Sequence, residues 1–378
     1  MIWQLINILQ RRSRNSRKQP GLQQFHLDPQ LLAGLFILAG LSLVILYSSG
    51  GQDMSLVIRQ ITRFSLGFIV MAIIAQIPPQ QFKLWSPWLY ILGLILLAAV
   101  LIAGDISKGA ERWLDFGLFR FQPSEVMKIS LPMILSWYLA NKALPPRKRN
   151  IFLCLIMLSV PTLLIAKQPD LGTAFLVVTS GLFVLFFSGI KWLHISLAGI
   201  TVGALTPILW YFMLDYQKQR VLTLLDPGQD PLGTGYHIIQ SQIAIGSGGI
   251  FGKGWLNGTQ SRLDFLPERS TDFVFSVISE EFGLVGVVLL LTLYFFIITR
   301  CVYIATQAQD TFSRLLAGSL TFSFLVYIVV NIGMVTGLLP VVGVPLPLIS
   351  YGGTSMVTIM ATFGVLMSIH THRRLVTS

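Results

Sequence analysis

The sequence predicts an all-α polytopic integral membrane protein with about ten transmembrane helices and one large extracytoplasmic loop. Of the 378 residues, 53% are hydrophobic and only 11% are charged, whereas a soluble globular domain carries about 25% charged residues. Apolar runs close to the roughly 20 residues needed to cross a bilayer recur along the chain. They fall at approximately 30–50, 61–78, 84–103, 124–142, 151–167, 171–189, 192–214, 273–299, 315–338 and 346–369.

A basic arm, residues 1–28, precedes the first apolar run. It contains Arg11, Arg12, Arg14, Arg17 and Lys18, and no small-residue cleavage site follows these bases. A secretory signal peptide would carry such a site. We therefore expect the first span to remain in the membrane as an anchor.

Basic residues on alternate connections set the orientation of the chain. Cytoplasmic connections are enriched in Lys and Arg, and here the bases gather in the arm, at Lys83, in 142–149, at Lys191, Arg300 and Arg314, and in the tail 373–378. Both termini are predicted to be cytoplasmic, and the connection 215–272 then faces outward. The net charge of +11 would suit nucleic acid, but bases dispersed over the inner connections are the ordinary topogenic pattern and fit anionic lipid better.

The chain reads as one helical membrane domain, residues 29–372, that includes the large loop 215–272. The sequence contains no repeat of fixed period. Cys154 and Cys301 both lie near expected cytoplasmic helix ends, and the outward segments contain no cysteine. A disulfide framework is therefore not expected.

The first polar outer connection carries three bases and an aromatic residue. Lys108, Arg112 and Arg120 flank Trp113 just before a predicted helix. Lys and Arg suit phosphate oxygens, and the indole suits a sugar or lipid. The alternative is an interfacial loop with an aromatic anchor.

Ionisable residues beside or within spans are costly and point to function. Glu125 and Lys128 lie three residues apart on one helical face, either as a structural pair or as a pair that binds an anionic substrate. Asp170 lies in a very short connection. It is either a helix N-cap or part of an outward-facing substrate site.

The 215–272 loop gathers glycines among charged residues. Arg220 lies near its start, Gln240 and Ser241 lie in a segment, 236–245, that suits a short helix, and a glycine-rich stretch runs from Gly246 to Gly254. Glycines let backbone amides approach a ligand closely. The stretch is not a Walker loop, because Gly follows its Gly-Lys pair instead of Ser or Thr.

Asp272 lies where this loop meets an apolar run. A partly desolvated carboxylate at that position is suited to be a general base, and a plain helix cap is the alternative. Glu280 and Glu281 lie about two turns deeper in the same predicted helix. They form either a proton path or buried hydrogen-bonded acids.

Four motifs in order resemble the SEDS family of cell-wall proteins. They are Gln168-Pro-Asp-Leu-Gly-Thr173, Ala244-Ile-Gly-Ser-Gly-Gly249, Phe265-Leu-Pro-Glu268 with Thr271-Asp272-Phe273, and Pro345-Leu-Pro-Leu-Ile-Ser350-Tyr-Gly-Gly353. The likeness covers nearly the whole chain. Arg269 and the segment 339–345 resemble the elongation branch of the family, and Ser270 departs from a His common in relatives.

This resemblance implies a bacterial inner-membrane peptidoglycan glycosyltransferase that polymerises lipid II for cell-wall elongation and rod shape. It implies Asp272 as the essential general base and a class B penicillin-binding protein transpeptidase, with other elongation complex proteins, as partners. The leaving undecaprenyl pyrophosphate requires positive charge nearby. Lys108, Arg112, Arg120, Lys128 and Arg220 are the candidates, with Trp113, Glu125, Asp170, Gln240 and Ser241 as further substrate contacts.

A divalent cation, Mg or Mn, is compatible with this chemistry, but no closed ligand set is visible in the sequence. Two other functions fit a protein of this kind. A lipid II flippase would require charged residues along a path to the cytoplasmic side. A non-catalytic scaffold of the elongation complex would use the large loop as a docking surface.

Overall fold

A computed structural model of the protein describes residues 26–372 except 104, 108, 109, 116–119, 230–232, 264 and 267. Its long helices correspond one by one to the predicted apolar runs. They are α2 (Pro29–Ser49), α3 (Met54–Ala75), α4 (Pro79–Ala103), α5 (Pro123–Ala140), α6 (Lys148–Lys167), α7 (Leu171–Phe187), α8 (Trp192–Phe212), α12 (Val274–Thr306), α13 (Thr311–Val335) and α14 (Thr354–Thr371).

The helices confirm the predicted class of helical membrane protein. Within the described residues, seven helices are long and apolar enough to cross a bilayer: α2, α3, α4, α6, α12, α13 and α14. The apolar helix α7 is somewhat shorter. Many large apolar side chains on the outside of the bundle are exposed, as expected where lipid is the solvent.

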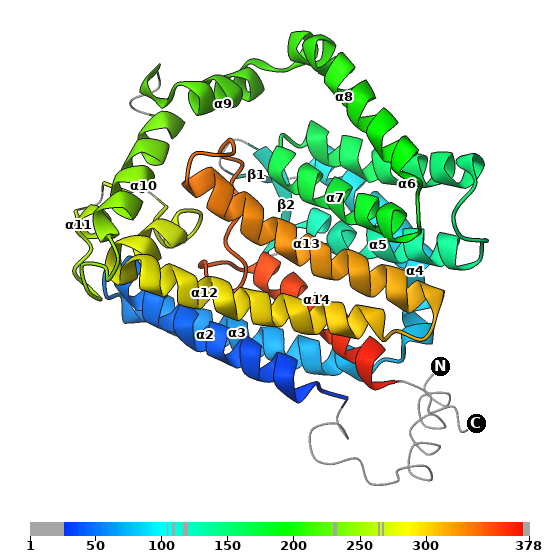
Figure 1. The fold of residues 1–378 in the computed structure, drawn as a ribbon, viewed down its shortest axis with the longest axis horizontal. Coiled ribbons are helices and arrows are strands. Elements are labelled where there is room, and N and C mark those ends of the chain that lie inside the picture. Colours follow the sequence, from blue (N-terminus) through cyan, green and yellow to red (C-terminus); the bar gives the residue numbers. More distant parts are fainter. Residues whose placement is uncertain are drawn as a thin grey trace.

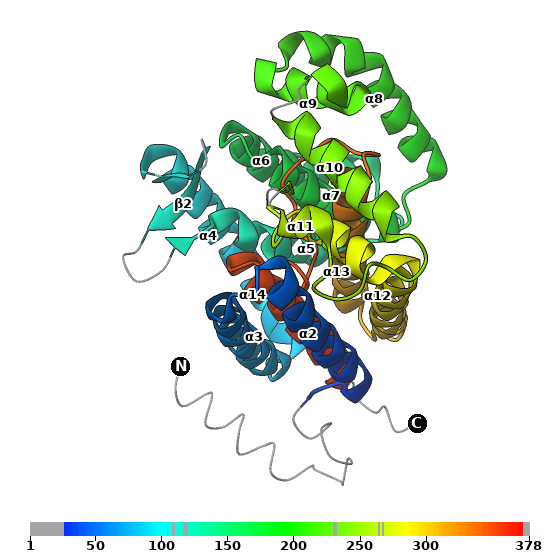
Figure 2. The same ribbon diagram turned by 90° about the vertical axis from the view of Figure 1, so that its left-hand side faces the viewer.

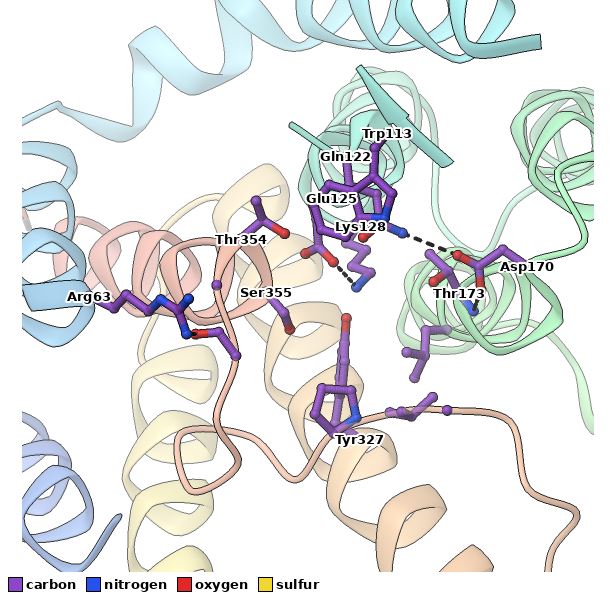
Figure 3. Close-up of a pocket in the computed structure, with 16 residues that line it drawn as sticks. Arg63, Trp113, Gln122, Glu125, Lys128, Asp170, Thr173, Tyr327, Thr354 and Ser355 are labelled. Carbon is purple, nitrogen blue, oxygen red and sulfur yellow. Dashed lines mark hydrogen bonds and ion pairs between the residues drawn. The ribbon is translucent and has the colours of Figure 1, made fainter. Parts of the chain in front are cut away.

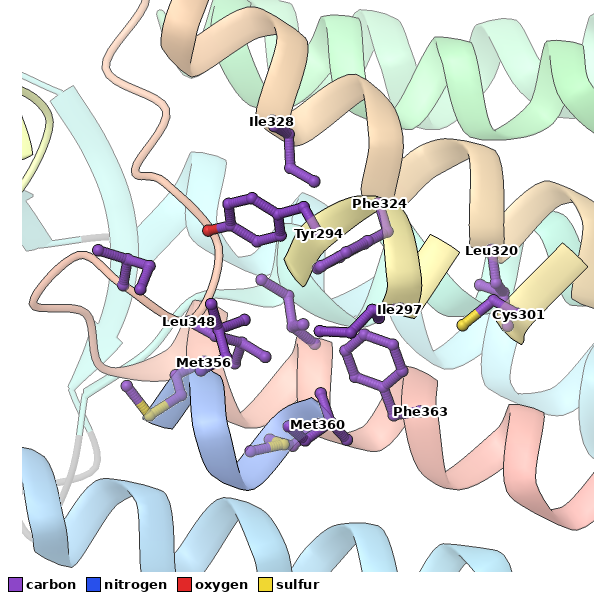
Figure 4. Close-up of a cluster of buried hydrophobic side chains, with 14 of the residues drawn as sticks. Tyr294, Ile297, Cys301, Leu320, Phe324, Ile328, Leu348, Met356, Met360 and Phe363 are labelled. Atoms are coloured by element: carbon purple, nitrogen blue, oxygen red, sulfur yellow. The ribbon is translucent and has the colours of Figure 1, made fainter. Parts of the chain in front are cut away.

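The long helices run beside one another, with α13 at the centre of the bundle (Figure 1). Helix α13 packs against α5, α7 and α12, whereas α14 packs against α3. Figure 4 shows one buried cluster, in which the rings of Tyr294, Phe324 and Phe363 meet between α12, α13 and α14. The ring centroids of Phe324 and Phe363 are 5.1 Å apart in an edge-to-face arrangement, which is a favourable geometry.

The connection after α8 is largely helical. It contains α9 (Asp215–Leu225), a 3-10 turn (Pro227–Gln229), α10 (Thr234–Gly248) and the short α11 (Thr259–Arg262). The helix expected over 236–245 therefore lies within α10. In both ribbon views α8 and α9 arch over the bundle, and α10 returns the chain to α12 (Figures 1 and 2).

A small antiparallel sheet between α4 and α5 was not predicted. Strand β2 (Ala110–Asp115) pairs with both β1 (Asp105–Ser107) and β3 (Arg120–Phe121). These strands are too short and too polar to show a clear alternating pattern. The all-α prediction is correct for the membrane domain and incomplete for this connection.

Helix α12 is broken at Gly283, where the backbone has φ 62° and ψ −160°. The break is closed by the glycine-rich stretch after α10. The N–H groups of Lys253 and Gly254 donate to the carbonyls of Glu280 and Glu281, both at 2.9 Å. A Cβ on Gly248 would lie 1.9 Å from the carbonyl oxygen of Ser279. These glycines therefore serve backbone packing against α12, and the expectation that they approach a ligand is wrong for Gly248, Gly252 and Gly254.

The last membrane helix begins at Thr354, eight residues later than expected. Pro345 and Pro347 lack the N–H groups that a helix needs, and Leu348 has a positive φ of 61°. The preceding residues therefore form an irregular segment inside the protein. Residues 343–345 and 352–353 of this segment form one wall of a cavity.

Candidate active site

A cavity of about 550 Å³ lies among the N-terminal ends of α5, α7 and α14. Figure 3 shows its polar side chains pointing toward a common space. They come from α3, β2, α5, α7, α13 and α14, and they are Arg63, Trp113, Gln122, Glu125, Lys128, Asp170, Thr173, Tyr327, Thr354 and Ser355. Five of these residues were not predicted to be near a site: Arg63, Gln122, Tyr327, Thr354 and Ser355.

Glu125 and Lys128 form the predicted pair on the first turns of α5. The Lys128 ammonium lies 2.6 Å from Oε1 of Glu125 and 5.1 Å from the centre of the Tyr327 ring. The Tyr327 hydroxyl points toward this ammonium (Figure 3). The predicted pairing is therefore confirmed, and both residues line the cavity. Binding of an anionic substrate by the pair stays a prediction.

Asp170 is the helix N-cap that was one of the two predicted roles, and its role at a substrate site stays a prediction. Its Oδ1 accepts from the Thr173 N–H at 3.1 Å and so caps α7, and Oδ2 accepts from the Gln122 amide at 3.1 Å. The capped turn faces the cavity. Gly172 lets the irregular segment pass closely, because a Cβ there would lie 2.6 Å from the Val342 carbonyl oxygen.

Asp272 lies one residue before the N-cap of α12, which is Phe273. Asp272 is therefore not the N-cap residue itself. Its backbone carbonyl accepts from the buried Asn331 amide at 2.9 Å. Its Oδ2 lies 3.5 Å from where a Cβ on Gly343 would stand, and Gly343 is part of the cavity wall. Asp272 is half-buried and is not itself one of the residues that line the cavity, but its carboxylate lies next to this wall residue.

Neighbouring backbone contacts fix the Asp272 segment. The Ser350 hydroxyl donates to the Thr271 carbonyl at 2.6 Å, and the Tyr351 N–H donates to the Ser270 carbonyl at 2.8 Å. The Ser270 hydroxyl donates to the carbonyl of Ser49 on α2 at 3.1 Å. Asp272 is consequently held between α2, α13 and the irregular segment before α14.

Arg63 is the cation that the sequence reasoning missed. It lies within α3, and its guanidinium stacks over the Tyr351 ring at 4.2 Å and donates to the Gly352 carbonyl at 3.4 Å. An arginine within an apolar run is itself a signal of function. Hydropathy alone marks residues 61–78 only as a span and does not show what the guanidinium contacts.

The other predicted basic residues are not brought to the cavity by any described contact. Arg220 lies on α9, which arches over the bundle in both views (Figures 1 and 2). Lys108 lies outside the described residues, and so do the side chains of Arg112 and Arg120. Trp113, between them in sequence, does line the cavity.

The two predicted substrate contacts on α10, Gln240 and Ser241, do not line the cavity. Ser241 is fully buried and its hydroxyl lies 2.8 Å from that of Ser276 and donates to the Val335 carbonyl at 2.5 Å. This side chain joins α10 to α12 and α13. Gln240 is its neighbour on α10, and neither residue lines the cavity.

Glu280 and Glu281 are buried acids with fixed partners. Glu280 accepts from Lys253 at 2.8 Å and from the N–H groups of Thr259 and Gln260 at 2.8 and 3.0 Å. Glu281 accepts from the Ser48 hydroxyl. Of the two alternatives, the structure has the hydrogen-bonded acids, which hold the loop onto α12 and α2. Because Glu280 and Glu281 hold the loop in place, they do not favour the charged path that a flippase would require.

The described residues include no group of three or more His, Cys, Asp and Glu side chains placed to hold a metal ion. The cavity is lined by Arg63, by the paired Lys128 and Glu125, by Asp170, and by three helix N-termini, of which Asp170 caps that of α7. Helix N-termini carry partial positive charge and exposed N–H donors. The arrangement suits a polar, negatively charged substrate, with a carboxylate at one edge.

The family model described as "Cell cycle protein", for FtsW, RodA and SpoVE, matches residues 24–375. Among curated relatives, the peptidoglycan glycosyltransferase MrdB of Escherichia coli (strain K12) is 53% identical over 362 residues, which cover 96% of this chain and 98% of the relative. Stage V sporulation protein E of Bacillus subtilis (strain 168) is 33% identical over 320 residues, covering 84% of this chain and 87% of the relative.

Solved structures show the same fold. A chain from a structure of a peptidoglycan synthase complex, described as coordinating polymerization and crosslinking, superposes with a TM-score of 0.80 at 34% identity, covering 91% of this chain and 97% of that one. The rod shape determining protein RodA of Thermus thermophilus superposes with a TM-score of 0.69 at 30% identity, covering 91% and 96%.

Proposed function

Since the chain belongs to the FtsW, RodA and SpoVE family of cell cycle proteins, we propose that it is a peptidoglycan glycosyltransferase in which Asp272 is the general base. It acts on lipid II in the inner membrane, and its relatives MrdB and RodA assign it to cell-wall elongation and rod shape. The roles of individual residues in this reaction are our inference.

The reaction joins the disaccharide of one lipid II molecule to another. Asp272 accepts the proton of the 4-hydroxyl of the acceptor N-acetylglucosamine. The oxygen then forms a bond to the anomeric carbon of the donor N-acetylmuramic acid. The bond from that carbon to the diphosphate breaks, and undecaprenyl pyrophosphate leaves with its electron pair. Attack from the opposite side converts the α-linked donor into a β-1,4 linkage.

One observation supports this assignment: the Asp272 carboxylate lies next to a wall residue of a polar cavity that is lined by two cations, Arg63 and Lys128, and two acids, Glu125 and Asp170. Its Oδ2 stands 3.5 Å from the Cβ position of Gly343, a wall residue. A general base must reach the hydroxyl proton it removes, and a diphosphate leaving group needs positive charge around it. The cavity offers both kinds of group.

The orientation and the partner belong to the same proposal. Lys and Arg in alternate connections support cytoplasmic termini and a cavity that opens toward the periplasm. The protein then consists of a basic arm (1–28), the membrane domain (29–372) and a short tail (373–378). The likeness to a chain of a peptidoglycan synthase complex supports a partner in crosslinking, which we take to be a class B penicillin-binding protein.

Polymerisation of purified lipid II tests the catalytic role. The Asp272→Asn variant keeps the side-chain shape but cannot accept the proton, so glycan synthesis should fall at least a thousandfold while partner binding stays near normal. The matched control is Asp215→Asn, an exposed acid in the first turn of α9, which should polymerise normally. Glycan chains made by Asp272→Asn at the native rate would refute the role.

A further inference from the structure

We propose that Arg63 and the first turn of α14 form the subsite for the diphosphate of the lipid-linked donor. This inference rests on the proposed function, and it names the part of the cavity that holds the leaving group. It differs from the sequence-based candidates, which placed the phosphate on Lys128, Arg220 or the first outer connection.

Arg63 is a cation without an acidic partner. No carboxylate of the described residues lies within ion-pair distance of its guanidinium, and its contacts are the Tyr351 ring at 4.2 Å and the Gly352 carbonyl at 3.4 Å. It lies nine residues after the first residue of α3, roughly 13 Å along the helix. An arginine at that depth is costly unless an anion compensates it.

The N-terminus of α14 lies at the same wall. Its N-cap is Gly353, which provides no side-chain acceptor for the exposed N–H groups. Thr354 and Ser355, the first two helical residues, line the cavity. A helix N-terminus left open in this way attracts phosphate through its N–H donors and its dipole. The guanidinium of Arg63 adds a planar fork of donors suited to phosphate oxygens.

A second, independent observation indicates that a ligand fills this cavity. Glu125 is only 4% exposed, and its Oε2 has no hydrogen-bond partner among the described residues. Its other oxygen, Oε1, is bound by Lys128 at 2.6 Å. A buried carboxylate oxygen without a donor is costly. A sugar hydroxyl or an acetamido N–H would supply that donor.

The two observations together define the ligand chemistry. Arg63 and α14 attract an anion, whereas the unpaired oxygen of Glu125 requires a hydrogen-bond donor. A glycosyl diphosphate carries both groups in one molecule. Lys128 is less suited to the diphosphate, because the carboxylate of Glu125 already balances its charge.

The irregular segment before α14 connects this subsite with Asp272. Gly343 lies beside the Asp272 carboxylate, and Gly352 accepts from Arg63. The Tyr351 ring lies under the Arg63 guanidinium, and the Tyr351 N–H donates to the Ser270 carbonyl at 2.8 Å. One stretch of backbone therefore links the proposed base, beside Gly343, with the proposed leaving-group subsite at 351–355.

Binding can be measured without turnover in the Asp272→Asn background. The probes are undecaprenyl diphosphate and undecaprenyl monophosphate, each in nanodiscs of zwitterionic lipid. Arg63→Ala should weaken binding of the diphosphate about tenfold or more, and binding of the monophosphate much less. Arg59→Ala is the matched control, because Arg59 lies one turn earlier on α3 and is exposed. It should leave both affinities unchanged.

Further variants separate the possible outcomes. If Arg63→Ala does not fold, Arg63→Lys replaces it and should weaken diphosphate binding severalfold, since the charge remains but the fork is lost. Inorganic pyrophosphate that competes equally well with the lipid would show that only free diphosphate chemistry is recognised. Unchanged affinity in the Arg63 variants, with Lys128→Ala weakened, would overturn the proposal. Normal polymerisation by Asp272→Asn would instead refute the catalytic role and leave the binding result valid.

Discussion

The side-chain amide of Asn331 on α13 donates a hydrogen bond of 2.9 Å to the backbone carbonyl of Asp272. The same nitrogen donates at 2.8 Å to the carbonyl of Val344 on the cavity wall. Asn331 is fully buried. One amide thus ties the backbone of Asp272 to the Val344 carbonyl on the cavity wall.

Replacing Asn331 by Leu should lower the rate of polymerisation about 10- to 100-fold, because a base displaced by ~1 Å loses rate on this order. The two carbonyls would lose a donor, at a cost in unfolding free energy of roughly 1–3 kcal/mol. Glycan synthesis at saturating lipid II and thermal unfolding in detergent check both effects. Ser323→Ala on the same helix is the control, since Ser323 only donates to the Ser319 carbonyl. A native rate for Asn331→Leu would contradict the positioning role.

Single and double variants of the Glu125–Lys128 ion pair should differ in stability. Lys128→Met leaves a buried carboxylate without its cation, and such a loss costs about 3–5 kcal/mol. The double variant Glu125→Gln with Lys128→Met removes both charges and should regain most of this stability. Activity should remain low in both, because both side chains line the cavity. Recovery of polymerisation in the double variant would mean that the pair is structural only.

The membrane helices could be predicted because a bilayer imposes length and composition on each span. The start of α14 could not, because prolines within an apolar run do not change its hydropathy. Asp170 was correctly expected at a helix start, since the residue type and the short connection both favour an N-cap. The pairing of Glu125 with Lys128 followed from their helical spacing.

The cavity itself depends on contacts between residues far apart in sequence. Arg63 meets the 351–352 turn across almost 290 residues, and no local pattern encodes such an approach. The glycines of the large loop are predicted to approach a ligand because their conformational freedom can be inferred from sequence. The backbone of α12, against which they pack, cannot be inferred in this way. Ser241 was similarly expected at a substrate site, but its partners on α12 and α13 lie far along the chain.

Gly283→Ala should prevent stable folding. The residue has a positive φ of 62°, and an added Cβ would lie 2.3 Å from the backbone nitrogen of Gly252. The break in α12 would have to close or the loop would have to leave it. We expect little folded protein in size-exclusion chromatography after detergent extraction. Gly40→Ala on α2 is the control, because its Cβ would meet nothing within 4 Å. Normal yield of Gly283→Ala would show that the loop and α12 adapt.

Asp28 at the start of α2 predicts a pH-dependent contribution to stability. Its Oδ2 lies 2.5 Å from Nη2 of Arg300 and 3.2 Å from Nε2 of His370. Burial is the largest single influence and raises the pKa of Asp28, but the hydrogen bonds from Arg300 and the Leu31 N–H and the charges of Arg300 and His370 together outweigh it, so the pKa is lowered from 3.8. A lowered carboxyl pKa stabilises the folded state fully above the unfolded pKa, and this stabilisation is lost as the pH falls through the folded pKa.

Asp28→Asn keeps an N-capping side chain and removes the charge, so it should cost about 3 kcal/mol at neutral pH by leaving Arg300 without its acid. The difference in unfolding midpoint between the native protein and this variant should not decrease from pH 7 to 5, because protonation of His370 can only add to the attraction for the Asp28 carboxylate. It should shrink below about pH 4, where the native carboxylate takes up its proton. Asp310→Asn, at the exposed cap of α13, should change the midpoint much less. A difference that grows as the pH falls from 4 to 3 would have the wrong sign and would exclude the ion pair as its source.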